Sequence, residues 1–283
     1  MKRAQFPLDN PIRFIQNRTP DSHKGDYGRA FCVVGSYSMA GAAIIASRAC
    51  LRSGIGICDV CLPDSIYPIV ASAVPEAVYT IRNDDNQLIF ERMEKATAIL
   101  IGCGLGLSAE SEDLLNTILL NAKCPLVIDA DGINLLKKHI DLLERYQNEV
   151  IITPHLAEMS RLVDIPIDDI KRNKTQIASD FAKKHGVTVV LKDHHTVVAT
   201  PDCSIYQNTT GNAGMSTGGS GDMLAGMITA FVAQGYNAND SAKAAVFLHG
   251  AAGDLAAEKF GMISMLPTDM IELLPETYSI YLD

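Results

Sequence analysis

The sequence predicts one α/β domain over residues 1–283, in which helices cover both faces of a mostly parallel sheet. Three observations predict this class. Short runs rich in valine, isoleucine and leucine recur along the chain without the polar alternation of half-exposed strands. Alanine-rich or amphipathic segments separate these runs, as crossover connections between parallel strands require. No linker, repeat or low-complexity segment divides the chain.

The N-terminal half begins with a β-α-β unit. We expect a strand at 29–35, a helix at 39–54 that ends at Gly54, and a second strand at 56–63. Further strands are expected at 97–102, 125–130, 149–154 and 187–192, with a helix near 110–122. Their uninterrupted apolar character suits strands that are covered on both faces.

The C-terminal half departs from the parallel pattern at 187–207. This stretch predicts three short strands with tight turns, and connections that short join only antiparallel strands. We therefore expect an antiparallel edge. Two nearly apolar helices follow at 222–234 and 240–259, the second capped by Asn239 or Asp240, and both should pack centrally on the sheet.

Composition excludes several classes of protein. With 24 basic and 33 acidic residues, the formal charge of −9 argues against non-specific binding to nucleic acid or acidic membranes. No apolar run reaches the roughly 18 residues of a membrane span, and the N-terminus lacks the apolar core of a signal peptide. Seven cysteines, mostly in apolar segments, predict reduced thiols in a soluble cytoplasmic protein, with Cys58 and Cys61 on opposite faces of a strand.

The segment TGGSGDMLAG at 217–226 carries the clearest chemical signal. Gly218, Gly219 and Gly221 permit positive φ angles and leave backbone amides unshielded. A helix expected to begin near Asp222 adds its positive dipole end and the amides of its first turn. Together these features predict a cradle for a phosphate or a developing oxyanion. The alternative is a glycine-rich turn in which Asp222 only caps the helix.

A carboxylate beside an anion cradle suits a reaction at a hydroxyl group. We expect Asp222 to stay ionised at neutral pH, because the helix dipole favours its charged form. It could then orient a substrate hydroxyl and accept its proton during phosphoryl transfer, which needs mainly positioning and charge neutralisation. The chain has no Walker motif. The pattern therefore predicts transfer from a nucleotide to an alcohol by another route.

Seven segments together resemble the ribokinase-like superfamily and, within it, the ADP- or ATP-dependent NAD(P)H-hydrate dehydratases. They follow in order along nearly the whole chain, at 23–36, 40–56, 101–106, 127–134, 153–162, 191–202 and 208–226. The resemblance implies a three-layer ribokinase-like sandwich. It also implies a metabolite-repair lyase that dehydrates the S-epimer of hydrated NADH or NADPH (NADHX or NADPHX), with ADP or ATP as co-substrate and Mg²⁺ at the phosphates. The hydrate hydroxyl would be phosphorylated and phosphate then lost, with Asp222 as the base.

The resemblance further implies which residues bind each substrate. The hydrate is expected to contact Asp222 and five other residues: Gly41, Ala42, Ala43, Gly106 and His155. The nucleotide is expected to lie against ten residues: Lys192, Asp193, His194, His195, Thr196, Asn212, Gly218, Gly219, Ser220 and Gly221. The family's usual glycine after the lysine is Asp193 here. Beside phosphates an acidic side chain is unfavourable unless it turns outward.

Two acidic motifs leave structural and metal-binding roles open. Glu158 follows His155 by three residues at the start of a helix, where Thr153 could equally provide the cap. The resemblance places Glu158 near the magnesium and phosphates. Asp129 and Asp131 lie where a strand enters a loop, where carboxylates could hold Mg²⁺ through water or Asp131 could cap a helix.

Two other functions compete with the dehydratase. One is a small-alcohol kinase of the same superfamily, acting on a thiazole or pyrimidine vitamin precursor. The other is a non-catalytic nucleotide-binding regulator, which a loss of Asp222 would have favoured. The segments KGDYG at 24–28 and TPHLAE at 153–158 favour the dehydratase. We expect His249 to be a core histidine, the partner epimerase to be a separate chain, and the protein to form a homo-oligomer.

Overall fold

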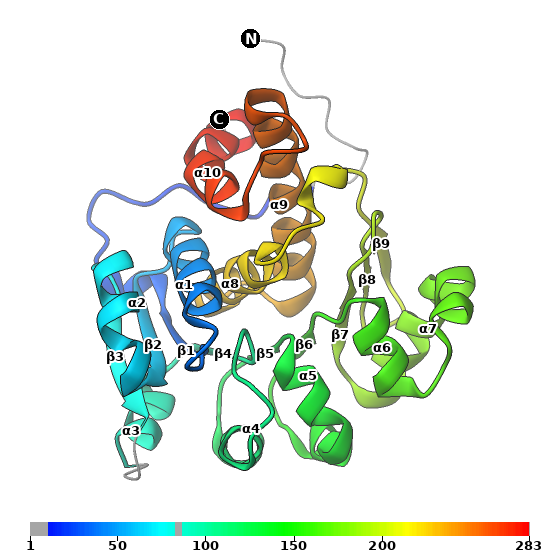
Figure 1. Ribbon diagram of the computed structural model, residues 1–283, viewed down its shortest axis with the longest axis horizontal. Coiled ribbons are helices and arrows are strands. Elements are labelled where there is room, and N and C mark those ends of the chain that lie inside the picture. The colour runs from blue at the N-terminus through cyan, green and yellow to red at the C-terminus, as the bar shows by residue number, and fades with distance from the viewer. Residues whose placement is uncertain (1–10, 83–86, 283) are drawn as a thin grey trace.

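A nine-stranded sheet organises the computed structural model, which describes residues 11–82 and 87–282. The strand order is β3-β2-β1-β4-β5-β6-β7-β8-β9, with helices on both faces (Figure 1). Strands β1 to β7 are parallel, and β7, β8 and β9 are antiparallel. The predicted fold class and its antiparallel edge are confirmed. Residues 1–10, 83–86 and 283 of the predicted 1–283 domain lie outside the described residues.

The strands lie close to the predicted ranges. They are β1 (Arg29–Val33), β2 (Ile57–Pro63), β3 (Val78–Arg82), β4 (Ala98–Ile101), β5 (Leu126–Ile128), β6 (Val150–Ile152), β7 (Thr188–Leu191), β8 (Val197–Ala199) and β9 (Ile205–Gln207). Sequence reasoning missed β3. Its burial alternates, because it is an edge strand, and it therefore lacks the continuous apolar run that revealed the other parallel strands.

Five helices share one hydrophobic core on one face of the sheet. They are α1 (Ala40–Arg52), α2 (Tyr67–Ala73), α8 (Ser220–Ala233), α9 (Ala238–Phe260) and α10 (Pro267–Leu282). Helix α8 is buried along its whole length from Met223 to Ala233, as its apolar sequence predicted. The expected cap of α9 was wrong: Asn237, rather than Asn239 or Asp240, accepts the amide hydrogen of Asp240 at 2.9 Å.

The opposite face is covered by a second core and a second set of helices. They are α3 (Gln87–Lys95), α4 (Ala109–Asn121), α5 (Asp131–Leu136), α6 (Leu156–Val163) and α7 (Ile167–His185). Short 3-10 helices connect elements at η1 (Lys24–Tyr27), η2 (Asp64–Ile66), η3 (Lys137–Arg145) and η4 (Ala213–Met215). Cys58 belongs to the first core and Cys61 to the second, as the strand alternation predicted.

The carboxyl ends of the parallel strands meet at one edge of the sheet, which is where the predicted site residues lie. The loops after β1, β4, β5, β6 and β7 reach this edge, together with the N-terminal ends of α1, α6 and α8. These loops pack closely: a side chain on Gly102 would place its Cβ 1.9 Å from the backbone oxygen of Asp129. Among the described helices, none is long and apolar enough to cross a membrane.

The seating of α8 against α1 yields a test of the fold. A Cβ added at Gly226 would lie 2.2 Å from the Ala46 backbone oxygen, so Gly226→Ala forces the two helices apart. We expect a loss of about 2 kcal/mol of unfolding free energy, typical of overpacking, measured by urea denaturation. Gly41→Ala is the matched control, because a Cβ there meets nothing within 4 Å. Equal urea midpoints for Gly226→Ala and the wild type would contradict this packing.

Candidate active site

Helix α8 begins in the glycine-rich segment, two residues before the expected start. Ser220 is its first residue, and Gly219 is the N-cap with a φ of 96°. Asp222 is therefore the third helical residue and not the cap. Within the described chain, no side chain caps this end of the helix; the Ser220 amide donates to the Thr217 oxygen at 3.4 Å, which leaves the amides of Gly221 and Asp222 for another acceptor. A capping role does not explain Asp222.

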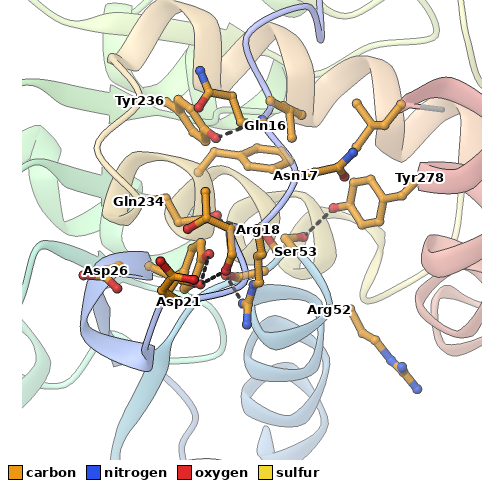
Figure 2. A pocket seen from close by; sticks show the side chains of 17 residues that line it. Gln16, Asn17, Arg18, Asp21, Asp26, Arg52, Ser53, Gln234, Tyr236 and Tyr278 are labelled. Atoms are coloured by element: carbon orange, nitrogen blue, oxygen red, sulfur yellow. Dashed lines mark hydrogen bonds between the residues drawn. The ribbon is translucent and has the colours of Figure 1, made fainter.

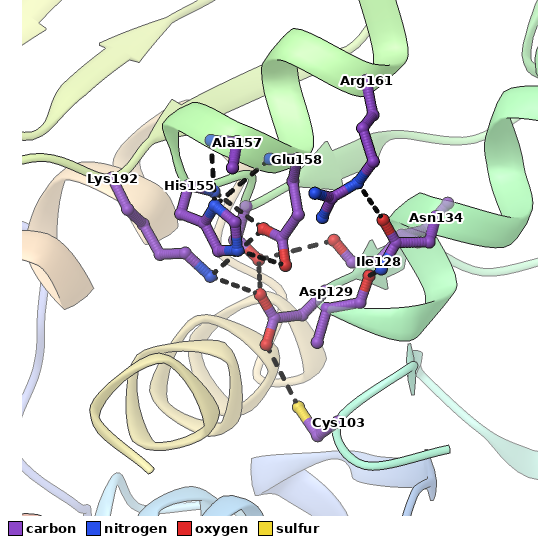
Figure 3. A network of polar contacts seen from close by, with 11 residues as sticks. Cys103, Ile128, Asp129, Asn134, His155, Ala157, Glu158, Arg161 and Lys192 are labelled. Carbon is purple, nitrogen blue, oxygen red and sulfur yellow. Dashed lines mark hydrogen bonds and ion pairs between the residues drawn. The ribbon is translucent and has the colours of Figure 1, made fainter. Parts of the chain in front are cut away.

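An ion pair between the partly buried Lys192 and the buried Asp129 lies beside this helix end (Figure 3). The Lys192 Nζ is 2.7 Å from Asp129 Oδ1, and the Thr153 hydroxyl donates to the same oxygen at 2.6 Å. The Cys103 thiol donates to Asp129 Oδ2 at 3.4 Å. Burial would raise the pKa of Asp129, but Lys192 and the hydrogen bonds outweigh it and lower the pKa. Asp129 is thus a stable, satisfied carboxylate.

Asp222 belongs to the same cluster but does not take part in the ion pair between Lys192 and Asp129. One side-chain ligand atom from each of Cys103, Asp129 and Asp222 lies within 4.8 Å of the others. Burial, followed by repulsion from Asp129, raises the pKa of Asp222 to about 6. The expectation that the helix dipole would govern this pKa was wrong, because desolvation and a neighbouring carboxylate dominate. Asp222 is still mostly ionised at neutral pH, and it is a stronger base than an exposed aspartate.

Lys192 links the ion pair to the helix end. A Cβ added at Gly221 would lie 3.2 Å from the Lys192 Nζ, so the ammonium stands beside the first turn of α8. Its Nζ is also 4.0 Å from Glu158 Oε2. Burial opposes the charged form, yet the Asp129 and Glu158 carboxylates raise the pKa of Lys192. The site therefore holds a permanent positive charge next to the predicted phosphate cradle.

His155 and Glu158 form the capping box of α6. His155 Nδ1 accepts the amide hydrogens of Ala157 at 3.0 Å and Glu158 at 3.1 Å. Glu158 Oε2 accepts the amide hydrogen of His155 at 2.7 Å, and Oε1 lies 3.2 Å from His155 Nε2. Burial lowers the pKa of His155 and raises that of Glu158. His155 is the cap itself, so the alternative that assigned this role to Thr153 was wrong.

Asp129 and Glu158, which are predicted to hold Mg²⁺ through water, are both engaged by protein groups. Both oxygens of Asp129 and both oxygens of Glu158 have protein partners, and contact with the ion through water stays a prediction. Asp131 does not cap a helix, because the N-cap of α5 is Ala130. Asp131 Oδ2 instead accepts the amide hydrogen of Gly106 at 2.8 Å and holds the loop after β4.

A pocket of about 900 Å³ opens beside α8, a volume in the range of small-molecule sites. Nine of the ten residues predicted to bind the nucleotide line it, and Gly219 is the exception. Asn212, one of the nine, donates to the Gly253 backbone oxygen at 2.9 Å and to Asp254 Oδ1 at 3.0 Å. The loop that carries Asn212 is thereby tied to α9.

The five residues predicted to contact the hydrate besides Asp222 divide into two groups. Ala42 and Ala43 are buried in the core, where Ala42 packs against Gly104. At Gly41 and Gly106 an added Cβ would meet nothing within 4 Å, so both leave open space. Gly41, Gly106 and His155 therefore lie accessible at the edge that carries Asp222, whereas the two alanines serve close packing of α1.

Sequence reasoning missed several residues of this site. His249 is buried and bonded, as expected of a core histidine, but it also lines the pocket, with Nε2 3.3 Å from Ser220 Oγ. Burial lowers the pKa of His249 to about 4, so its ring is neutral. Cys103 was not singled out, although it follows β4 at the predicted edge. Lys174, described below, gave no local signal because its partners come from a different loop.

A second pocket, of about 580 Å³, lies where α1 and α8 end, away from the edge that carries Asp222 (Figure 2). The N-terminal segment and α10 complete its wall. Its polar groups bond to one another: the Tyr278 hydroxyl donates to Ser53 Oγ at 3.0 Å, and the backbone N–H of Gln16 donates to the Tyr236 hydroxyl at 3.3 Å. None of the predicted site residues lines this pocket in the described parts of the chain.

Comparison with known proteins shows what this chain is similar to. A family model described as NAD(P)H-hydrate dehydratase matches residues 30–276. The bifunctional NAD(P)H-hydrate repair enzyme Nnr of Thermofilum pendens is 34% identical over 97% of this chain and 54% of its own length. The ADP-dependent (S)-NAD(P)H-hydrate dehydratase of Neisseria meningitidis is 35% identical over 92% of this chain and 88% of its own. The chain thus spans about half the length of the bifunctional relatives it matches.

A solved structure supports the same relationship. The ADP/ATP-dependent NAD(P)H-hydrate dehydratase of Bacillus subtilis, co-crystallized with ATP and Mg²⁺, superimposes with a TM-score of 0.85. It is 28% identical, and the alignment covers 96% of each chain.

The buried ion pair yields a test of the site's electrostatics. Lys192→Met leaves the Asp129 carboxylate buried without its cation, so we expect a loss of about 3 kcal/mol of unfolding free energy. The Lys192→Met, Asp129→Asn double variant should recover most of this loss, because the unpaired charge is then absent. Urea denaturation at pH 7 measures both. If the single and double variants unfold at the same urea concentration, Lys192 does not stabilise the protein by neutralising Asp129.

Proposed function

We propose that this chain, which belongs to the NAD(P)H-hydrate dehydratase family, dehydrates the S-epimer of hydrated NADH or NADPH at the expense of ADP or ATP. The observation that carries the proposal is the position of Asp222. Its carboxylate has a pKa of about 6 and lies in a cluster with Cys103 and Asp129, in the first turn of an uncapped helix beside a nucleotide-sized pocket. This arrangement suits proton removal from an alcohol next to a phosphate.

The nucleotide would occupy the pocket of about 900 Å³. Its phosphates would lie against Gly218 to Gly221, where the first-turn amides of α8 and the helix dipole favour an anion. Lys192 stands beside this turn and adds a positive charge. We expect Mg²⁺ to accompany the nucleotide and to neutralise phosphate charge when bound, and we assign it no protein ligand.

Asp222 would act as the base. It accepts the hydroxyl proton of the hydrate while the hydroxyl oxygen attacks the terminal phosphorus, and AMP leaves when ADP is used. The carbon–oxygen bond then breaks, phosphate departs with the oxygen, and loss of a proton from the neighbouring carbon forms the ring double bond. The sum is hydrate plus ADP giving NAD(P)H, AMP and phosphate. A base with a raised pKa takes up the proton more readily than an ordinary aspartate.

The hydrate would bind at Gly41, Gly106 and His155, which are accessible at the same edge. Because His155 Nδ1 accepts two amide hydrogens, its ring proton lies on Nε2, which is 3.2 Å from Glu158 Oε1, and these contacts would fix the orientation of the ring beside the hydrate. We further propose a cytoplasmic location, where thiols stay reduced, because all seven cysteines are free. An epimerase would supply the S-epimer.

A direct assay tests this function. The chain is incubated with S-NADHX or S-NADPHX, MgCl₂ and either ADP or ATP, and the return of reduced-nicotinamide absorbance is followed. We expect recovery that requires a nucleotide, with AMP released when ADP is used. Failure with both nucleotides, accompanied by phosphorylation of a thiazole or pyrimidine alcohol, would show a small-alcohol kinase instead.

The matched control for this assay is Asp222→Asn, which keeps the shape of the side chain and removes the base. Its kcat should fall by about 100- to 10,000-fold, the usual contribution of a general base. Its affinity for ADP, measured by calorimetry, should stay close to that of the wild type. If the variant keeps its kcat, Asp222 is not the base.

A further inference from the structure

The turn between β7 and β8 places an acidic side chain where the nucleotide is expected. Asp193 directly follows Lys192 and lines the pocket of about 900 Å³. The resemblance described above leads us to expect glycine at this position. An unpaired carboxylate here would repel the phosphates of a nucleotide, because few water molecules would screen the two charges. A neighbouring positive charge is therefore needed.

Helix α7 supplies this charge through Lys174. The Lys174 Nζ lies 2.8 Å from Asp193 Oδ2 and 2.9 Å from the backbone oxygen of His195. The two side chains of the ion pair are only 14% and 19% exposed. Partial burial raises the pKa of Asp193, but hydrogen bonds from Lys174 and His194 outweigh it and bring the pKa to about 2. One ammonium group thus holds both a side chain and the backbone of the same turn.

The setting of Lys174 on α7 differs from that of its neighbours. Lys171, Arg172 and Thr175 are exposed, whereas Lys174 is half-buried. The helix departs from helical geometry at Asn173, which has a φ of −128° and directly precedes Lys174. Lys174 contacts the 192–196 turn, while Asp222 lies by Cys103 and Asp129. A change at Lys174 is therefore expected to act on nucleotide binding and not on the chemical step.

We propose that Lys174 is a positioning residue for the nucleotide, which cancels the charge of Asp193 and fixes the backbone of the 192–196 turn through the His195 carbonyl. The inference rests on the proposed function, in that the pocket is taken to bind ADP or ATP. It explains how this chain carries an aspartate beside phosphates. Asp193 faces Lys174 and His194, so its charge is paired before a nucleotide arrives.

The test compares ADP affinity, KM for ADP and kcat among matched variants of the full chain. Lys174→Met should raise the Kd and KM for ADP by roughly tenfold to a hundredfold, the effect of losing a charged hydrogen bond, with kcat within about twofold of the wild type. Lys171→Met removes the same charge from an exposed position of α7 and should change neither value. Lys174→Gln should also weaken ADP binding, and it replaces Lys174→Met in the test if the methionine variant does not fold.

A rescue experiment distinguishes two causes of weaker ADP binding, the loss of the charge pair and a general loss of structure. In the Lys174→Met background, Asp193→Gly should restore most of the ADP affinity, because the unpaired carboxylate is then absent. Unchanged ADP affinity in both Lys174 variants would overturn the inference, as would an equal loss in Lys171→Met or no rescue by Asp193→Gly. If the wild type binds ADP but does not dehydrate the hydrate, the proposed function fails while these affinities still decide the role of Lys174.

Discussion

The ion pair between Lys192 and Asp129 is the interaction on which the rest of the site depends. It joins the loop after β5 to the end of β7, and Thr153 and Cys103 complete the hydrogen bonds of its carboxylate. Burying a carboxylate at the edge of the sheet is costly unless a cation accompanies it. Because each partner stabilises the charge of the other, both stay ionised, and the surrounding groups lie next to one fixed positive and one fixed negative charge. Neither partner is free to act as an acid or base near neutral pH.

The pairing decides which carboxylate of the site can accept a proton. Asp129 is held ionised by Lys192, and both oxygens of Glu158 are engaged by His155. Asp222 takes part neither in the ion pair with Lys192 nor in the contacts with His155. Its pKa rises to about 6 through burial and the nearby charge of Asp129. Burial also raises the pKa of Glu158, but His155 holds its oxygens, so Asp222 is the natural candidate for proton transfer among the groups whose pKa values are pushed apart. The three carboxylates therefore differ in role although they lie together.

Much of the fold followed from the sequence because its determinants are local. Continuous apolar runs identified the buried parallel strands, and the short connections at 187–207 required antiparallel pairing. The edge strand β3 was missed because its burial alternates. The glycine-rich segment and Asp222 were identified for the same local reason: glycines and an acidic residue at the start of an apolar helix indicate a site for an anion with a carboxylate beside it.

The pKa shifts and ion pairs of the site could not be predicted from local sequence. The pKa of Asp222 is raised by burial and by Asp129, which comes from another loop, and the helix dipole alone gave the wrong direction. The sequence also did not reveal that Asp129 pairs with Lys192, because only the folded chain brings the two together. The same holds for Asp193, whose charge is paired by a lysine on α7.

The pH dependence of kcat/KM for the hydrate, at saturating ADP, tests the central claim most directly. Asp222 must be ionised to accept a proton, so activity should be present above its pKa and fall as the pH drops through about 6. In Asp129→Asn this acid limb should move to lower pH, because removing the neighbouring negative charge eases ionisation of Asp222. Protonation of the nucleotide would produce a limb that this substitution does not move. A wild-type limb near the ordinary aspartate value of about 4, or a limb unmoved in Asp129→Asn, would contradict the account.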